Sequence, residues 1–217
     1  KDEDKYAVLN LEALILSDLG KFTEAEKKFA TIEEMDWSNI AKTYHKENAA
    51  DLKVKMSDYA GAIQIYNELS HELENKWSHL KYIPTYSSDL LELVDLKCLI
   101  AKAHYLESKN GNQSARQEAI KMYEFIRSSI SRIVNSNWES QSSSHLIDEV
   151  YTNLYYILMS HLDTYLETDN TDHILQAYQI LSEFKNQILK RDIHSRTYLK
   201  ENLTDSTLIQ YYKLKSD

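Results

Sequence analysis

Two short motifs of the chain contain residue types that bind metals. His71-Glu72-Leu73-Glu74-Asn75 begins like the helix of a zinc protease, but that site needs a second histidine one turn later, where this chain has asparagine. Glu68-Leu69-Ser70-His71 matches one part of a di-iron site, which also requires a second such motif and two further glutamates on facing helices. We therefore expect a solvated helix end at both motifs, and we predict no metal and no other cofactor.

The chain offers few residues suited to covalent catalysis. Its single cysteine, Cys98, lies in a helical stripe beside Leu99, which favours a buried, inert thiol over a nucleophile. The eight histidines include no close pair at ligand spacing, and three glycines are too few for a phosphate-binding loop. We predict that the protein is not an enzyme. The alternative, a helical hydrolase or a metal bundle, requires a convergent cluster of acids and histidines.

One basic cluster and one aromatic cluster are candidate docking surfaces. Four basic residues share a predicted helix: Arg116, Lys121, Arg127 and Arg132. We interpret them as an ordinary solvated face, with docking of an acidic partner as the alternative. Three tyrosines share a later helix: Tyr151, Tyr155 and Tyr156. For these we expect packing between helices, with a partner-binding patch as the alternative.

Charge and composition exclude several classes of protein. The net charge of −9 argues against a nucleic-acid binder that works by neutralising phosphates. No apolar run approaches the length of a membrane span, and the start of the chain does not resemble a signal peptide. A single cysteine excludes an internal disulfide framework, so we expect an intracellular protein, cytoplasmic or nuclear.

The elements that must position these residues are helices. Three glycines and one proline in 217 residues leave few tight turns, which favours an all-α fold of about eight to ten helices. Apolar residues at steps of three and four predict helices over 6–19, 23–35, 39–57, 58–75, 89–109, 114–135, 144–168 and 171–191. Residues 135–144 are predicted to be a loop, and 197–202 and 205–215 to be short helices.

Local details of these helices are also predicted. Thr23, with a glutamate three residues later, resembles a capping box at the start of the second helix. Gly111 is expected to end a helix in the left-handed conformation. Leu19, together with the leucines and alanine before it, is expected to face inward. Ile174 and Leu181 are expected to pair the last long helix with the helix before it.

A repeated pattern links the hairpins. Gly20 and Phe22 are followed by Ala25 and Phe29, and a small residue followed by a bulky one suits two helices in close contact. The equivalent small residues are Ala25, Ala62, Ala119 and Ala177, at spacings of 37, 57 and 58 residues. The first spacing is close to the 34-residue period of tetratricopeptide arrays, and the later two are much longer.

Residues 6–75 resemble two tetratricopeptide repeats (TPR), and residues 87–191 resemble longer, irregular hairpins of the same kind. The resemblance implies one domain over residues 1–217, in which antiparallel hairpins stack as an α-solenoid with a right-handed superhelix. Residues 192–217 would then cap the stack. In that family the first helix of each hairpin lines a concave groove that binds peptides or partner helices.

Transferred residue by residue, the resemblance places partner-binding groove positions on three helices. The first unit supplies Asn10, Leu14, Ser17 and Asp18. The second supplies Tyr44, Glu47, Asn48, Asp51 and Lys55. The third supplies Asp95, Cys98, Lys102 and Tyr105.

These positions imply a non-enzymatic scaffold for protein–protein interaction. It would be a subunit or adaptor of a multiprotein complex that binds a peptide or a partner's helix in the groove. The alternative is a regulatory, peptide-sensing domain of a larger receptor or transcription regulator, because bacterial peptide-pheromone receptors carry helical repeats of this size. The acidic, all-helical 14-3-3 proteins fit less well, since their paired-arginine and Arg-Tyr phosphate motifs are missing.

Overall fold

The computed structural model describes residues 2–35, 39–76, 88–134, 141–183 and 185 of the chain. These residues form helices and turns, with no strand among them, so the predicted all-α class is confirmed. The named helices are α1 (Asp2–Asp18), α2 (Phe22–Glu33), α3 (Asn39–Lys55), α4 (Tyr59–Lys76), α5 (Ser88–Lys109), α6 (Gln113–Val134) and α7 (Gln141–Thr168). Residues 171–183 form one further helical segment after α7.

Four turns between helices each contain one residue with a left-handed backbone. The described residues with positive φ are Gly20 (73°), Ser57 (63°), Gly111 (103°) and Asp169 (53°). They lie between α1 and α2, α3 and α4, α5 and α6, and α7 and residues 171–183. The predicted left-handed stop at Gly111 is therefore confirmed. Glycine suits this conformation because it has no Cβ, whereas serine is strained in it.

The turn after α1 shows how the hairpin closes. The N–H of Gly20 donates to the carbonyl of Ser17 (3.0 Å), and the N–H of Lys21 donates to the carbonyl of Leu16 (2.9 Å). This pair of bonds is a Schellman motif, which satisfies carbonyls that a helix end leaves without an intrahelical partner. Ser57 forms the same motif after α3, with bonds of 3.0 Å from its own N–H and 2.8 Å from the N–H that follows.

The first two hairpins correspond residue by residue at an offset of 37. The corresponding buried pairs are Ala13 and Ala50, Ala25 and Ala62, Phe29 and Tyr66, and Ile32 and Leu69. The turn residues Gly20 and Ser57 correspond at the same offset. The alanines let neighbouring helices approach closely, and the large ring one turn later fills the remaining space. The short repeat predicted from the sequence is thus present in the packing of both hairpins.

Three buried clusters follow one another along the molecule. The first joins α1 and α2 to Leu52 of α3. The second joins α3 and α4 to α5, and the third joins α5 and α6 to α7 and to Ile180. Helix α5 therefore lies inside the molecule with neighbours on several sides. Its apolar residues are distributed around its circumference, as is typical of a buried helix.

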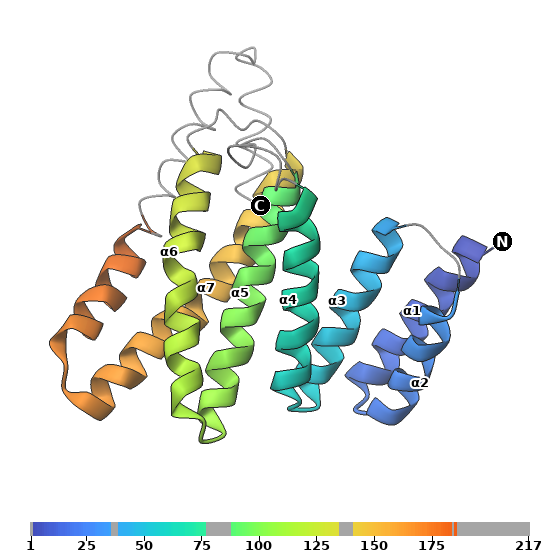
Figure 1. Cartoon of the computed structure of the whole chain (residues 1–217), viewed down its shortest axis with the longest axis horizontal. Coiled ribbons are helices and arrows are strands. Elements are labelled where there is room, and N and C mark those ends of the chain that lie inside the picture. Colours follow the sequence, from blue (N-terminus) through green and yellow to red (C-terminus); the bar gives the residue numbers. More distant parts are fainter. Residues whose placement is uncertain (1, 36–38, 77–87, 135–140, 184, 186–217) are drawn as a thin grey trace, which may run out of the picture.

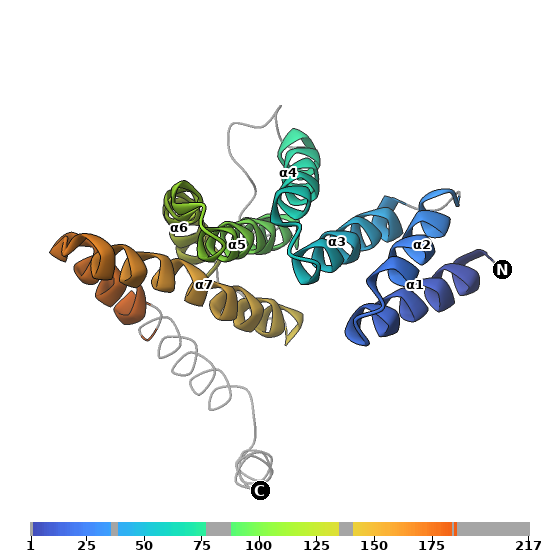
Figure 2. The same cartoon turned by 90° about the horizontal axis from the view of Figure 1, so that it is seen from below.

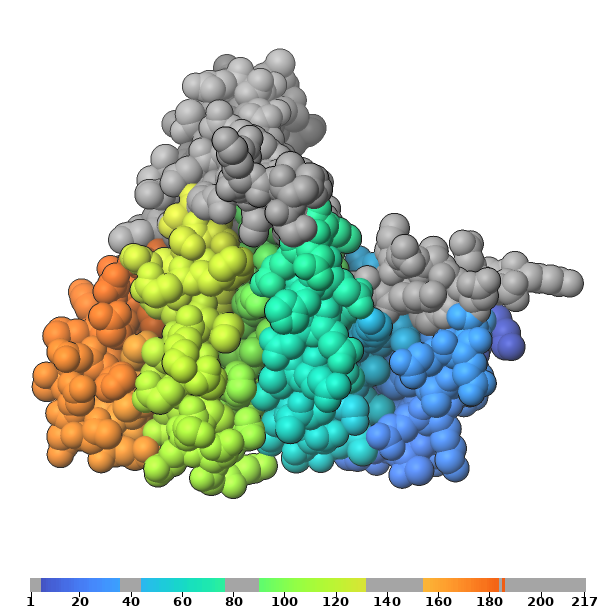
Figure 3. Space-filling view, viewed as in Figure 1, coloured from blue at the N-terminus to red at the C-terminus, as the bar shows by residue number. Residues whose placement is uncertain are grey.

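The helices form a curved array that begins with α1 at one end. Figure 1 shows consecutive helices running in opposite directions side by side, and each contacts the next. Helices α2, α4 and α6 follow one another along one side, and α7 crosses the other side of α5 (Figure 2). Figure 3 shows the face built from α2, α4 and α6, where side chains fill the space between the ribbons.

The predicted capping box at Thr23 is wrong. Helix α2 begins at Phe22, with Lys21 in the N-cap position and no side-chain capping bond, so Thr23 already lies inside the first turn. The turn after Gly20 sets this start, because Lys21 takes part in the Schellman motif that ends α1. The predicted loop over 135–144 is also partly wrong, since α7 begins at Gln141. Residues 135–140 lie outside the described residues.

Two predicted inward faces are wrong in part. Leu19 is 66% exposed, because it lies in the turn after α1 ends. In the segment 171–183, Ile174 (40%) and Leu181 (52%) are exposed, whereas Ala177 and Ile180 are buried. The buried face of this segment differs from the predicted one, because Ile180 and not its neighbour Leu181 joins the cluster of α5, α6 and α7. The predicted capping segment 192–217 and the loop around Pro84 lie outside the described residues.

Candidate functional site

The first two groove positions meet between α1 and α3. The side-chain amide of Asn48 donates from Nδ2 to Oδ1 of Asn10 (3.2 Å), and both side chains are half-buried. An asparagine carboxamide has two N–H donors and an oxygen with two lone pairs. One bond between the two amides therefore leaves both with capacity to bind a peptide backbone.

Leu14 and Tyr44 lie beside this amide pair. Leu14 is one helical turn after Asn10, and Tyr44 is one turn before Asn48, so each shares a helix face with its asparagine. Leu14 is half-buried, and Tyr44 is 62% exposed. An apolar side chain and an accessible aromatic ring thus lie near the two amides that bond to each other. This combination suits an extended chain or a helix that presents both polar and apolar groups.

Charged groove positions connect the helices to one another. Lys55 forms an ion pair with Asp18 across α3 and α1 (2.6 Å), and both side chains are largely exposed. Asp51 accepts a hydrogen bond from the hydroxyl of Tyr66 on α4 (2.5 Å). Burial, together with the carboxylate of Asp51, raises the pKa of that hydroxyl. The exposed pair of Lys55 and Asp18 adds little stability but joins the two helices that carry the amide pair, whereas the bond of the buried Tyr66 joins α3 to α4.

Three further predicted groove positions, Glu47, Asp95 and Ser17, are at least half-buried. Glu47 is half-buried on α3, next to Asn48, and Asp95 is half-buried on α5. Ser17 is 5% exposed, so it belongs to the packing of the first hairpin. Helices α1 and α3 thus bring most of the predicted positions of the first two units together.

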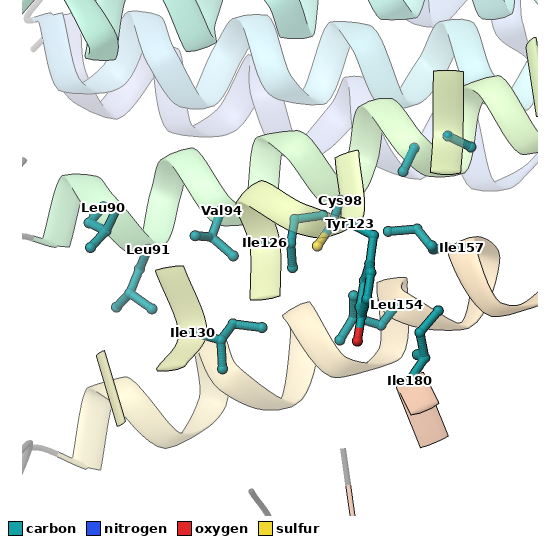
Figure 4. Packing of buried hydrophobic residues seen from close by; sticks show 12 residues of the cluster. Leu90, Leu91, Val94, Cys98, Tyr123, Ile126, Ile130, Leu154, Ile157 and Ile180 are labelled. Carbon is teal, nitrogen blue, oxygen red and sulfur yellow. The ribbon is translucent and has the colours of Figure 1, made fainter. Parts of the chain in front are cut away.

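Two of the predicted groove positions of α5, Cys98 and Tyr105, are covered by other helices. Cys98 is fully buried among side chains of α6 and α7, as Figure 4 shows, and burial raises the pKa of its thiol. Tyr105 is 7% exposed, and the centre of its ring lies 5.8 Å from that of Tyr156 of α7. The ammonium of Lys102 lies over the same Tyr156 ring, 5.6 Å from its centre. Cys98 and Tyr105 are therefore inaccessible, whereas Asp95 and Lys102 are half-buried, as are Asn10 and Asn48.

Burial of Cys98 agrees with the prediction of an inert thiol, because a protonated and inaccessible sulfur is a poor nucleophile. His71, from the motif that resembles part of a zinc site, is 74% exposed and lies 3.3 Å from Glu74 of the same helix. No group of three or more metal-ligating side chains is found in the described part of the chain. Within the same residues, no helix combines the length and the apolar run needed to cross a membrane.

The basic cluster on α6 is not a uniform solvated face. Arg116 is 5% exposed and holds Glu167 of α7 with two bonds of 2.7 and 2.9 Å, so its interpretation as a solvated residue is wrong. Arg127 reaches Glu183 (3.2 Å), and Lys121 pairs with a glutamate of its own helix. The side chain of Arg132 lies outside the described residues. The guanidinium of Arg116 binds α6 to α7 instead of facing solvent.

Two histidines that are distant in sequence meet at the last described turn. Nδ1 of His161 on α7 lies 3.1 Å from Nδ1 of His173, and one of these nitrogens must carry the proton that the other accepts. Burial and the neighbouring His173 lower the pKa of His161 to about 4. Sequence patterns did not indicate this pair, because its two members belong to different helices and their contact depends on the turn at Asp169.

No protein-family model matches this chain, and no curated protein or solved structure shows significant similarity to it.

Proposed function

We propose that the chain is a non-enzymatic, TPR-like scaffold that binds a peptide or a partner's helix at the accessible face of α1 and α3. The proposal includes an α-solenoid of stacked hairpins with a right-handed superhelix. Support comes from the 37-residue correspondence of the first two hairpins and from the left-handed residue shared by all four described turns. An array of this kind presents an extended surface, which suits protein recognition.

The observation that carries this proposal is the amide pair of Asn10 and Asn48. It holds two neighbouring first helices together and leaves amide groups for a ligand's backbone, while Tyr44 offers a large ring to a ligand side chain. Recognition would therefore combine backbone hydrogen bonds with contact between apolar surfaces. The longer, irregular hairpins after residue 87 favour a dedicated subunit of a multiprotein assembly over a general reader of peptides.

Affinity purification of the tagged chain from its own cells tests this function. We expect a partner protein to co-purify in stoichiometric amount, and the double variant Tyr44→Ala/Asn48→Ala to reduce its recovery at least tenfold. Gln117→Ala, at an exposed position of α6, is the matched control and should keep the partner. Thermal unfolding of each variant separates a loss of binding from a loss of folding, because Asn48 also contacts α1.

Two other outcomes would count against the scaffold. If the chain purified alone with a small peptide that Asn48→Ala releases, the peptide-sensing alternative would be favoured. If a partner co-purified equally with all variants, binding would involve a face other than that of α1 and α3.

A further inference from the structure

Helix α1, together with Leu19 in the first position after it, carries an apolar stripe on its outer face. Val8 is 57% exposed, Leu11 59%, Ile15 50% and Leu19 66%. Their spacing of three, four and four residues places them on one side of the helix. Single exposed leucines are ordinary on protein surfaces, whereas a row of four large aliphatic side chains is typical of an interaction site. We call these four residues the α1 stripe.

The 37-residue correspondence assigns an equivalent to each residue of the α1 stripe. Val8, Leu11 and Ile15 correspond to His45, Asn48 and Leu52 of α3, and Leu19 corresponds to Met56 in the turn after α3. These four later residues form the contact with the first hairpin. The ring of His45 lies 5.4 Å from that of Phe29, Asn48 bonds to Asn10, and Leu52 and Met56 join the cluster of α1 and α2.

The α1 stripe is therefore the surface that, one repeat later, receives a preceding helical hairpin. Its exposure contrasts with that of α3, where His45 is 4% and Leu52 2% exposed. The distribution of apolar residues around α1 is also that of a helix with neighbours on more than one side. Its apolar residues are spread around the helix, as in α5, which is covered on several sides. Helices α2 and α3 are the neighbours that the structure shows for α1, and the stripe lies on the side away from them.

We infer that the α1 stripe binds an amphipathic helix of a partner protein, packed against α1 as α2 packs against α3, with Lys or Arg flanking its apolar face. The charge of α1 is the reason for expecting Lys or Arg on the partner helix. The helix contains five acidic residues and one lysine, of which Glu12 pairs with Lys28 and Asp18 with Lys55. Basic flanks on the partner would therefore be attracted mainly to the acidic start of the helix. The four apolar residues require an apolar face in return, since burying them against polar groups would leave those groups without partners.

A second copy of this chain is a poorer occupant of the stripe. Two α1 helices facing each other would bring two acidic helices together, which is unfavourable. A partner helix with basic flanks avoids the repulsion and can add contacts to the edges of α1.

Fluorescence anisotropy with two stapled 18-residue helical peptides tests the inference. Both peptides carry the same leucine stripe, flanked in one by lysines and in the other by glutamates. We expect the lysine peptide to bind the whole chain at least tenfold more tightly than the glutamate peptide. Ile15→Glu should weaken that binding at least tenfold, although it adds a negative charge that would strengthen any non-specific attraction to lysines.

Leu166→Glu is the matched control, because Leu166 is 74% exposed on α7 and the substitution adds the same charge. It should leave binding of the lysine peptide unchanged. Ile15 is half-exposed, so the variant should fold, and circular dichroism verifies this. Failure of the lysine peptide to bind, or equal binding by wild type and Ile15→Glu, would overturn the inference. So would a wild-type dimer in sedimentation equilibrium that Ile15→Glu dissociates, because the occupant would then be a second copy.

This test is independent of the proposed groove on α1 and α3. The peptides address the outer face of α1, whereas Tyr44 and Asn48 address the accessible face between two first helices. Loss of partner recovery in the Tyr44→Ala/Asn48→Ala variant with normal binding of the lysine peptide would affect only the groove proposal. The reverse result would affect only the stripe.

Discussion

Gly20 and Ser57 occupy equivalent turn positions, although one is glycine and the other has a side chain. Both have positive φ and both close a Schellman motif, but only glycine adopts this conformation without strain. A Cβ on Gly20 would have no heavy atom within 4 Å, so the cost of a side chain there comes from the backbone alone. The two positions therefore form a matched pair for measuring that cost.

We expect Ser57→Gly to raise the free energy of unfolding by about 0.5–1 kcal/mol, because it relieves a left-handed serine. Gly20→Ser should lower it by about 1 kcal/mol for the converse reason. Urea unfolding of the two variants measures both values. If both substitutions changed stability in the same direction, the two turns would not be equivalent.

His161 should make the last described hairpin sensitive to acid. Burial lowers its pKa to about 4, below the value of about 6.5 that we take for the unfolded chain, so the folded state favours neutral imidazole. The unfolded chain then binds more protons between these two values, and stability falls as the pH is lowered through that range. The contribution of His161 is fully present above pH 6.5 and amounts to roughly 1–3 kcal/mol.

Urea unfolding of wild type and His161→Phe at pH 7 and pH 4.5 tests this expectation. The variant should lose less stability than wild type on acidification, because it has no imidazole to protonate at that position. His71→Phe is the control, because it removes an imidazole at a position that is 74% exposed. An unchanged pH dependence in His161→Phe would show that protonation of His161 does not limit stability in acid.

Contacts between elements depend on a few polar groups at helix ends. Arg116 near the start of α6 and Glu167 near the end of α7 form a two-bond ion pair that fixes these helices together. Close to it, Lys109 at the end of α5 reaches Asp163 of α7 (2.6 Å). These bonds connect the turn between α5 and α6 to α7, which is the helix that covers Tyr105 and Cys98.

Arg116→Lys should destabilise the chain by about 1 kcal/mol, because lysine keeps the charge but loses the paired geometry of the guanidinium. Arg127→Lys is the comparison, since the side chain of Arg127 is 40% exposed, and it should change stability by less than about 0.5 kcal/mol. A double-mutant cycle with Glu167→Gln measures the coupling directly. A coupling near zero would mean that packing of apolar residues alone holds α6 and α7 together.

Helices were predictable from the sequence because their apolar stripes are local. The predicted start at residue 39 is the start of α3, and the predicted helix 89–109 differs from α5 by one residue. The start of α2 was missed because the end of α1 determines it through Lys21. The coverage of α5 by α7 was missed for a different reason: Tyr105 and Tyr156 belong to separate hairpins, and no short pattern relates them.

The sequence could place candidate groove positions only where the repeat is regular. Asn10 and Asn48 were assigned to the groove because both lie in the regular part of the chain, and the structure brings them within hydrogen-bonding distance. Cys98 and Tyr105 were assigned to the groove by the same rule but are buried, because the third hairpin has α7 against it. The α1 stripe became recognisable only when the contacts of α3 gave its equivalent residues a role.

At the scale of the whole molecule, the array has an accessible face on α1 and α3 and an uncovered end on α1. Three buried clusters share α3 and α5, so packing is continuous from the first hairpin to Ile180. Such continuity lets each hairpin be positioned by its neighbours. We propose that a partner binds at the face that contains Asn10 and Asn48.

Site-specific photo-crosslinking tests this claim most directly. A photoreactive phenylalanine replaces Tyr44, which is 62% exposed beside the amide pair, and a second variant carries it at Gln117 on α6. We predict that irradiation of the complex purified from cells joins the partner to position 44 and not to position 117. Crosslinks from position 117 with none from position 44 would contradict the account.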